Sequence, residues 1–404
     1  MKVLILTADS NGAYPVPASK GGAVATLIEY LADENNKKML CDMEILSYYE
    51  PTAYNLSKKY KNISFNWVKI PTFVKFLDRL SFEFVRIARK EEKAVSFKSP
   101  FSLLYYIWKA RGVIRRTDAD KIIIENNIPL AMALKYTKFK GQWFYHLHNV
   151  PRIDGKCRDV MKKTTRFLCV SQYVADQICM DDSAIGKIKK EKVRILYNCV
   201  DTDKFKILSG KKNEDLKIKY GIKENDKVLI FTGRLTEEKG ADVLLEAMTL
   251  LPDNIKALIV GSYHYNADVK SEFQDKLYGL AKKLSDRVIF TGFIQHEDLP
   301  YLYNLADIAV LPSMWEEPAG LTNLEAMACG IPVITTSSGG IPEYVGKSVI
   351  LDRNEDLAKN ISVEVMRLLQ DKEYYYEMKE YSRAHVLTHF SKSKYLDNFF
   401  ITIQ

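Results

Sequence analysis

Two glutamates eight residues apart bracket a short loop in the last third of the chain. The segment reads WEEPAGLTNLEAMACGIP, with Glu317 before the loop and Glu325 within the helix that LTNLEAMACG predicts. Gly320 precedes this helix, so its first backbone amides are expected to bind a phosphate. Glu325, about one turn into the helix, would then reach a ribose. Glu317 would hold hydroxyls of a second group, so the segment predicts a grip on a sugar nucleotide. The helix dipole alone favours acids at such a position and would explain either glutamate singly.

Two cations follow an earlier predicted strand. In FTGRLTEEKGADVLL, Gly233 and Arg234 come directly after the strand and Lys239 lies where a helix begins. Arginine offers a planar fork and lysine a point charge, a combination that suits a diphosphate. An isolated pair of this kind is usually a surface charge pair, but the strand–turn–helix position favours a ligand site.

Two further loops after predicted strands carry candidate ligand contacts. Gly21 and Gly22 open a helix after a long loop, where glycines let backbone amides approach an anion. The loop lacks the G-x-G-x-x-G spacing, which argues against a dinucleotide-dependent dehydrogenase. Phe293 and Ile294 follow the strand VIFTG, where backbone groups and a ring could contact a base. A core phenylalanine is the equal alternative for Phe293.

His146 and His148 alternate on the predicted strand of YHLHNVP and therefore share a face. A metal site is disfavoured because no third ligand lies nearby in the sequence. His148, at the strand end, is better placed to contact a ligand, whereas His146 is expected to be a packed neighbour. The D-x-D patterns at 118–120 and 201–203 adjoin no phosphate-type loop and are interpreted as caps or hinge residues.

Short apolar strands alternate with helices along both halves of the chain, which predicts an α/β protein with two Rossmann-like, doubly wound parallel sheets. The polar stretch 203–227 is the expected join between the domains. A length of 404 residues also favours two domains. The first segment, MKVLILTADS, is interpreted as a buried strand rather than a signal peptide.

The charge is unevenly distributed. The net charge is +8, but residues 1–205 hold 35 basic and 22 acidic residues, a net +13. This asymmetry indicates an anionic partner for the first half, either a membrane face or a phosphorylated lipid. Nucleic acid would be another anionic partner, but the sequence contains no nucleic-acid recognition motif, so no nucleic-acid partner is expected. The six cysteines form no C-x-x-C pair and are expected to be reduced, which favours a cytoplasmic location.

Residues 73–95 have helical periodicity. The apolar residues on one predicted face are Phe73, Leu77, Leu80, Phe84 and Ile87, and the basic residues on the other are Lys75, Arg79, Arg86, Lys90 and Lys93. One interpretation is a helix docked on its own domain with a solvated basic face. The other is an amphipathic helix at a membrane surface, with peripheral attachment to the cytoplasmic face.

These blocks, in order, resemble the GT-B-fold glycosyltransferases of glycosyltransferase family 4. The resemblance covers almost the whole chain through KGGA, LHNVP, CVSQYV, YNCVDTDKF, FTGRLTEEKGADVLLEA, FTGFI and the WEEPAG segment, which holds the family's E-x7-E pattern. It implies two domains facing a cleft: an acceptor-binding domain at 1–202, a donor-binding domain at 203–385, and a C-terminal helix at 386–404 that crosses back. It further implies transfer of a sugar, with retention and without a metal or cofactor, from a nucleotide sugar, with UDP favoured. The implied acceptor is a glycan or a lipid-linked molecule, in the synthesis of surface polysaccharides or glycoconjugates.

The resemblance also assigns roles to individual residues. Arg234 and Lys239 neutralise the diphosphate, Glu325 binds the ribose and Glu317 contacts sugar hydroxyls. His148 lies near the sugar, and with Glu317, Arg234 and Lys239 it makes up the predicted catalytic set. The other residues implied in donor binding are Gly21, Gly22, Gly233, Phe293, Ile294, Ala319, Gly320, Leu321 and Thr322.

The chain departs from the family pattern at three positions. Pro318 and Ala319 stand where the family often has Gly and Phe, and Cys199 stands where Gly is common. The first two changes lie beside the expected donor sugar, so they leave the identity of the sugar open. A nucleotide-sugar epimerase of the same fold and a non-catalytic partner subunit are the alternative functions. The E-x7-E block argues against the epimerase, and the complete set of charged residues argues against loss of activity.

Overall fold

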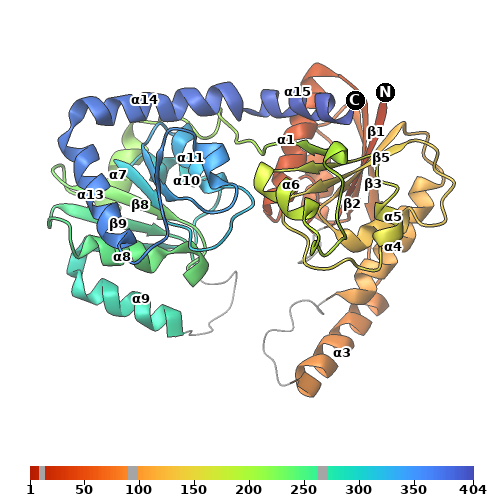
Figure 1. The fold of residues 1–404 in the computed structure, drawn as a ribbon, viewed down its shortest axis with the longest axis horizontal. Coiled ribbons are helices and arrows are strands. Elements are labelled where there is room, and N and C mark those ends of the chain that lie inside the picture. Colours follow the sequence, from red (N-terminus) through yellow and green to blue (C-terminus); the bar gives the residue numbers. More distant parts are fainter. Residues whose placement is uncertain (9–13, 90–98, 263–271) are drawn as a thin grey trace. The chain divides into compact units, whose positions relative to one another are not determined.

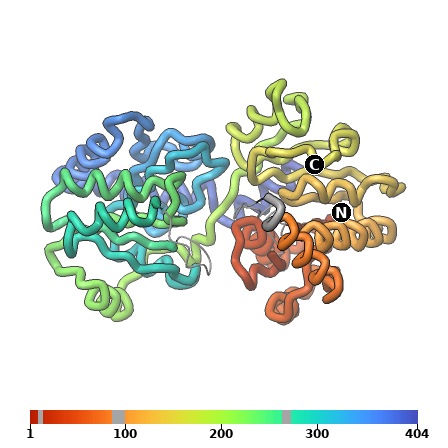
Figure 2. Tube along the Cα trace, turned by 90° about the horizontal axis from the view of Figure 1, so that it is seen from below, coloured from red at the N-terminus to blue at the C-terminus, as the bar shows by residue number. Residues whose placement is uncertain are grey.

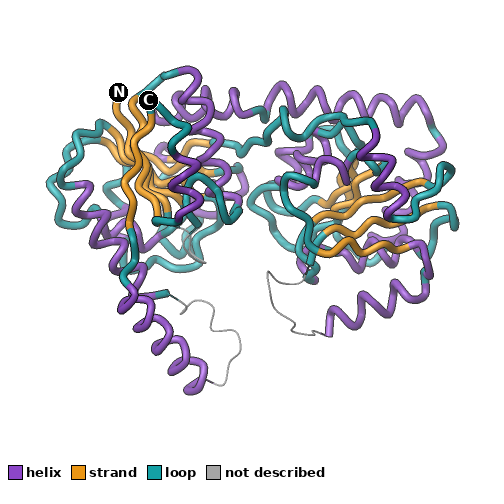
Figure 3. Tube along the Cα trace, turned by 180° about the vertical axis from the view of Figure 1, so that it is seen from behind, coloured by secondary structure: helices purple, strands orange, loops and turns teal. Residues whose placement is uncertain are grey.

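The structure is a computed structural model that describes residues 1–8, 14–89, 99–262 and 272–404. The chain divides into two compact units, Met1–Tyr197 with Tyr395–Gln404, and Asn198–Lys394. Figure 1 shows a sheet flanked by helices in each unit, and Figure 3 separates strands from helices by colour. The α/β class with parallel sheets is therefore confirmed. The domain bounds given above, including the separate segment 386–404, stay predictions.

The first unit is built on a seven-stranded sheet in the order β3-β2-β1-β4-β5-β6-β7, and the pairs are parallel. The strands are β1 Lys2–Thr7, β2 Asp42–Tyr48, β3 Ile63–Val68, β4 Lys121–Glu125, β5 Gln142–Leu147, β6 Arg166–Cys169 and β7 Val193–Ile195. The helices are α1 Ala23–Lys38, α2 Pro51–Ser57, α3 Thr72–Arg89, α4 Pro100–Ile114, α5 Arg158–Met161 and α6 Gln172–Cys179, with 3-10 turns at Ile128–Ala133 and Lys190–Lys192. Both ends of the chain lie in this unit (Figure 2).

The second unit has a six-stranded sheet in the order β10-β9-β8-β11-β12-β13, again with parallel pairs. Its strands are β8 Lys227–Thr232, β9 Ile255–Val260, β10 Val288–Gly292, β11 Ile308–Leu311, β12 Val333–Thr336 and β13 Val349–Leu351. Its helices are α7 Lys211–Lys219, α8 Ala241–Met248, α9 Glu272–Lys283, α10 Leu299–Tyr303, α11 Leu321–Ala328, α12 Ile341–Val345, α13 Leu357–Gln370 and α14 Lys372–His389, with 3-10 turns at Glu237–Lys239 and Ser285–Arg287. The last helix, α15 Lys392–Ile403, returns the chain to the first unit.

The local sequence explains these elements. The central strands are continuous apolar runs, as expected for parallel strands covered on both faces. All four residues of β11, IAVL, are buried, for example. Helix α6 begins after Ser171, whose hydroxyl accepts a hydrogen bond from the Val174 amide at 3.2 Å. All six cysteines are free thiols, and all but Cys179 are buried. Within the described ranges, no helix has both the length and the apolar character needed to cross a bilayer.

Helix α3, Thr72–Arg89, confirms the helix predicted at 73–95 as far as residue 89, but its burial differs from the docked interpretation. Val74 and Asp78 are its buried side chains, whereas Phe73 and Phe84, on the apolar face, are 64% and 73% exposed. The docked interpretation is therefore wrong for the apolar face. Lys90 and Lys93 lie outside the described residues, as do the side chains of residues 86–89.

Candidate active site

The predicted donor loops lie at one edge of the second sheet. In the order β10-β9-β8-β11-β12-β13, the winding of the chain reverses between β8 and β11. Parallel sheets bind ligands beyond the carboxyl ends of their strands, at this reversal point. The loop after β8 carries Gly233, Arg234 and Lys239, and the loop after β11 carries the segment around Glu317. The fold therefore brings together, at one place, two loops about 80 residues apart in sequence.

Lys239 and Glu317 form the central contact between these loops. The Lys239 ammonium lies 2.5 Å from Oε1 of Glu317, and both side chains are largely buried. The Ser313 hydroxyl donates to the same carboxylate oxygen at 2.9 Å. The sequence predicted separate roles for the two charged residues and did not predict their pairing. The pair fixes the position of the ammonium group, which is what electrostatic stabilisation of a leaving group requires.

Two glycines allow the loops to approach. Gly240 has a φ of 71°, and a Cβ there would lie 2.0 Å from the carbonyl oxygen of Pro312. Gly339 has a φ of 55°, and a Cβ there would lie 2.3 Å from the carbonyl oxygen of Glu317. Only glycine fits such positions without displacing the backbone. Sequence reasoning passed over both glycines, although each follows directly on a predicted site element or strand.

Arg234 is held more loosely than Lys239. Its side chain is 60% exposed, and its guanidinium lies 3.8 Å from the Glu238 carboxylate. An exposed pair at this distance contributes little to stability. Arg234 therefore stays available to an anionic ligand beyond the end of β8.

Helix α11 begins as predicted, directly after Gly320, and no side chain caps it. The first amides of an α-helix have no acceptor within the helix. In α11 these are the amides that the sequence assigned to a phosphate. Ala319, Leu321 and Thr322 flank this start and are partly exposed. The side-chain Oδ1 of Asn323 and Nε1 of Trp315 are buried without a hydrogen-bond partner among the described residues, so the site retains unused polar groups.

Glu325 is held by two side chains that sequence reasoning missed. Its Oε1 lies 3.0 Å from Nε2 of His296, and its Oε2 accepts from the Tyr303 hydroxyl at 3.0 Å. The Lys204 ammonium lies 2.9 Å from Nδ1 of His296, so Nδ1 accepts and the imidazole proton is on Nε2, facing Glu325. Burial raises the pKa of Tyr303, which keeps the hydroxyl as a donor. In the sequence, both partners are visible only as polar residues of the segment FIQHEDLPYLY, residues 293–303.

Phe293 and Ile294 follow β10, at the edge of the sheet. Phe293 is about half exposed, so the alternative of a core phenylalanine is wrong. Ile294 is partly buried. Both residues lie after the carboxyl end of a strand, as the sequence predicted. Their contact with a base stays a prediction.

The first unit holds a buried carboxylate–histidine cluster. Oε2 of Glu125, at the end of β4, lies 2.9 Å from Nε2 of His148 and 3.0 Å from Nδ1 of His146. All three side chains are buried, and the backbone amide of His148 also donates to Oδ1 of Asn126 at 3.1 Å. Sequence reasoning predicted a packed His146, which is confirmed, but missed Glu125. In the sequence, Glu125 could have been noticed as the single acidic residue at the end of the apolar strand KIIIE.

Glu125 changes the sequence argument about a metal. A third potential ligand does exist, supplied by the neighbouring strand β4 rather than by the adjacent sequence. The ligand atoms of Glu125, His146 and His148 lie within 4.8 Å of one another. Nε2 of His148 hydrogen-bonds this carboxylate. Neither ring nitrogen of His146 has a hydrogen-bond partner among the described residues, although its Nδ1 lies 3.0 Å from the same oxygen. The absence of a metal requirement stays a prediction.

The cluster shifts the pKa values of Glu125 and His148. Burial by itself raises the pKa of Glu125, but the contacts with His146 and His148 outweigh burial and lower it to about 2. Burial, joined by the neighbouring His146, lowers the pKa of His148 to about 4 against the opposing contact with Glu125. Glu125 is thus ionised and His148 neutral at physiological pH. Nε2–H of His148 then donates to Glu125, and its Nδ1 is left as an acceptor.

These shifts predict acid lability. Between its ordinary pKa and about 4, His148 binds a proton in the unfolded chain but not in the folded protein. Stability from this group is therefore full above the ordinary pKa and is lost as the pH falls, by about 3 kcal/mol in total. We expect urea melts to show this loss between about pH 7 and pH 4.5. A His148→Gln variant should flatten the profile, whereas the exposed His389→Gln should not; an unchanged slope in His148→Gln would contradict the assignment.

The glycines after β1 open helix α1 as predicted. Gly21 and Gly22 have φ values of 71° and 96°, and Gly22 is the N-cap residue without a side-chain cap. Of the two D-x-D patterns, the one at 201–203 is a local cap, whereas Asp120 of the other contacts the start of β1, 118 residues away in sequence. Oδ1 of Asp201 accepts from the Asp203 amide at 3.0 Å, and Oδ2 of Asp120 accepts from the Lys2 amide at 2.7 Å.

Known proteins share parts of this sequence and its fold. Residues 212–385 match the family model described as Glycosyl transferases group 1. An uncharacterized glycosyltransferase of Methanocaldococcus jannaschii is 32% identical over 216 residues, 52% of this chain and 52% of that protein. The putative glycosyltransferase YtcC of Bacillus subtilis is 26% identical over 385 residues, 92% of this chain and 85% of that protein. HepE of Anabaena, solved with UDP and glucose, superposes with a TM-score of 0.70 at 18% identity, covering 100% of this chain and 99% of HepE.

The fold is that of the GT-B glycosyltransferase HepE, and the second unit matches a glycosyltransferase model, so both findings support the resemblance found in the sequence. Within the chain, the match to the Glycosyl transferases group 1 model lies in the second unit. The chain spans about half the length of the first relative named above. The finer assignment to glycosyltransferase family 4 stays a prediction.

Proposed function

We propose that the chain transfers a sugar from a nucleotide-diphosphate sugar, with UDP as the favoured nucleotide, to a hydroxyl of a glycan or lipid-linked acceptor. The observation that carries this proposal is the site at the β8–β11 reversal point. There the uncapped start of α11, the Lys239–Glu317 pair and Glu325 adjoin one another in the fold. UDP is favoured because HepE, which shares the fold, is solved with UDP.

In the proposed reaction the bond between the anomeric carbon and the phosphate oxygen breaks, and the nucleotide diphosphate leaves with the electron pair. Negative charge grows on the diphosphate in the transition state, so cations and amides fixed in place lower the barrier. Lys239 is the fixed cation, and the first amides of α11 are the fixed dipoles. Arg234, which is exposed, would close onto the diphosphate when the donor binds.

We further propose retention at the anomeric carbon. The acceptor hydroxyl attacks from the face that the diphosphate leaves, and its proton passes to the departing phosphate oxygen. Glu317 is already paired with Lys239 and Ser313, which argues against a role as a covalent nucleophile. In this scheme Glu317 orients the ammonium group and hydroxyls of the sugar, and Nδ1 of His148 accepts from a sugar hydroxyl. Neither role uses a metal.

A donor panel tests the proposal. Nucleotide release would be measured from UDP-, GDP-, ADP- and dTDP-sugars with a chelator present. We expect release from one donor, and a donor Kd raised about tenfold or more in Glu325→Ala, because its ribose contacts are lost. Glu246→Ala, a helical glutamate of the same unit paired with Lys276, is the matched control.

The other outcomes separate the alternatives. Release of an epimerised sugar in the absence of an acceptor would identify an epimerase. No release from any donor, together with no nucleotide diphosphate binding by calorimetry, would identify a non-catalytic partner. Release that requires an added divalent ion would contradict metal independence.

A further inference from the structure

Helix α3 and the start of α4 expose a row of large apolar side chains on the first unit. On α3 the exposed residues are Phe73, Phe76, Leu77, Leu80 and Phe84, and on α4 they are Phe101, Leu104 and Trp108. We call these eight residues the α3–α4 face. Scattered single apolar residues on a surface are ordinary, but a contiguous apolar patch marks an interaction site. The five on α3 lie within residues 73–84, and the first and last are about 16 Å apart along the helix.

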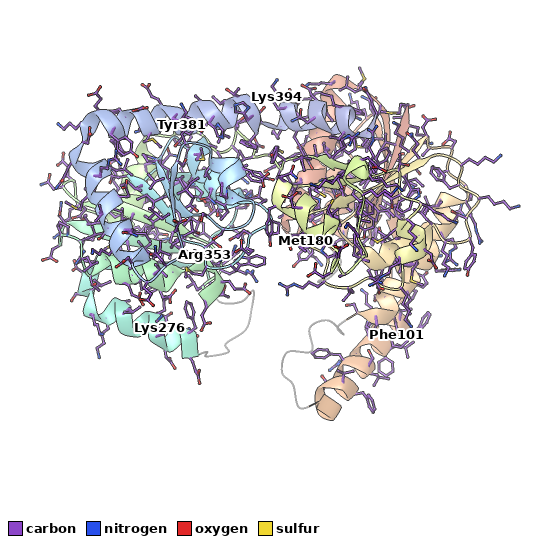
Figure 4. All side chains as sticks on the ribbon, in the orientation of Figure 1. Phe101, Met180, Lys276, Arg353, Tyr381 and Lys394 are labelled. Carbon is purple, nitrogen blue, oxygen red and sulfur yellow. The ribbon has the colours of Figure 1, made fainter. Side chains whose placement is uncertain are left out.

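A buried carboxylate holds this face outward. Asp78, in the middle of α3, accepts from the Phe101 amide at 2.8 Å and from the Ser102 amide at 3.2 Å, and so caps the start of α4. Val74, one turn earlier on the same side of α3, is buried as well. Because the polar anchor and the apolar row lie on different sides of the helix, docking α3 onto α4 cannot cover the apolar row. Figure 4 shows Phe101 where α4 begins beside α3.

The α4 part of the face combines aromatic rings with a cation. Phe101, Leu104 and Trp108 follow the i, i+3, i+7 spacing of one helix face. The Lys109 ammonium lies 4.6 Å from the centre of the Trp108 ring. Tryptophan and lysine are enriched together where a protein meets the boundary between lipid headgroups and acyl chains.

Charge selects the occupant. Lys75 and Arg79 of α3 are exposed, whereas its acidic side chains Asp78 and Glu83 are buried and half-buried. Residues 1–205 have a net charge of +13. A second copy seated on the same face would bring these like charges together. An anionic surface would instead attract these cations. A helix is only about as wide as a Debye length, so cations on the side of α3 that faces away from the surface are still attracted to it.

We propose that the α3–α4 face inserts into the interfacial region of an anionic lipid bilayer, with the cations of α3 and α4 on anionic headgroups. Helices with an aromatic and leucine face opposite a basic face lie in this region of membranes. The contact deepens the proposed function by placing the first unit where a lipid-linked acceptor would be. The contact does not itself depend on donor chemistry, so the two proposals fail separately.

The test is flotation of the full chain with vesicles of phosphatidylcholine alone or mixed with phosphatidylglycerol, without any donor. We expect binding to the anionic vesicles that weakens with salt. A Phe76→Ser, Leu80→Ser, Phe84→Ser variant should bind at least about tenfold more weakly, since each lost apolar group removes buried area from the bound state. Ile218→Ser, an equally exposed apolar residue on α7 of the second unit, is the control and should bind normally.

Because the three substituted residues are exposed, the triple variant should keep the wild-type melting temperature, which separates lost contact from lost fold. Failure of the wild type to float with anionic vesicles at low salt would overturn the proposal, as would unchanged binding by the triple variant. A wild-type dimer in solution that the triple variant converts to a monomer would also overturn it, by assigning the face to a second copy. Nucleotide release, measured separately, reports on the donor site alone.

Discussion

Lys239→Ala should lower the rate of nucleotide release from the preferred donor by at least about 100-fold. The substitution removes the fixed cation at the β8–β11 reversal point and leaves Glu317, largely buried, without its 2.5 Å partner. An unpaired carboxylate would then face the diphosphate, so repulsion adds to the lost attraction. The effect should appear mainly in kcat, because charge on the leaving group is greatest in the transition state. Steady-state release of nucleotide, with a chelator present, measures it.

Lys276→Ala is the matched control for Lys239→Ala. Lys276 also pairs with a carboxylate of the second unit, Asp242, at 2.6 Å, but on the surface between α8 and α9. Its substitution should leave turnover within about twofold. Lys239→Ala with a normal rate would remove the lysine from the proposed mechanism. A double variant, Lys239→Ala with Glu317→Gln, should recover part of the loss if the unpaired carboxylate is repulsive.

Glu125→Gln should lower kcat by at least about tenfold while leaving nucleotide binding, a property of the second unit, unchanged. Glu125 is the common partner of His148 and His146 at 2.9 and 3.0 Å. The amide oxygen of the introduced glutamine would be a weaker acceptor than the carboxylate. Its NH2 group would also be a donor that faces Nε2–H of His148, so the tautomer of His148 would no longer be fixed. Turnover and calorimetric binding of the nucleoside diphosphate separate the two effects.

Glu125→Gln should also reduce the free energy of unfolding by about 2 kcal/mol, because the buried His148 imidazole loses its charged acceptor. Glu44→Gln is a control from the adjacent part of the same sheet, where the carboxylate is 3.8 Å from the Lys2 ammonium. It should change neither turnover nor stability by much. A destabilised Glu125→Gln protein with unchanged kcat would restrict Glu125 to a structural role.

The sequence identified the parts of the site that are local in the chain. Gly320, Glu317 and Glu325 lie within nine residues, so their spacing alone indicated a helix start between two carboxylates. The alternation of apolar strands and helices likewise predicted two parallel sheets, because the periodicity of each element is set by its own residues. Strand ends could be located, and with them Arg234, Lys239, Phe293 and His148.

The contacts that position these groups could not be predicted in the same way. Lys239 meets Glu317 from 78 positions away, and His148 meets Glu125 from 23. These contacts depend on strand order, since β8 adjoins β11 and β4 adjoins β5. A single sequence gives no signal for such pairing beyond the residue types. His296 and Tyr303, which hold Glu325, were missed for this reason.

Helix α3 shows the same division most clearly. Its sequence determined that a helix forms and that apolar and basic residues lie on different faces. Only the tertiary structure decided which side of α3 is buried. The Asp78 carboxylate accepts hydrogen bonds from the first amides of α4, so the side of α3 that carries Asp78 packs against α4. Intrinsic periodicity is a property of neighbouring residues, whereas burial depends on what the rest of the chain brings to each face. The sequence therefore determined the elements and the local chemistry of this protein, and the tertiary structure decided their partners.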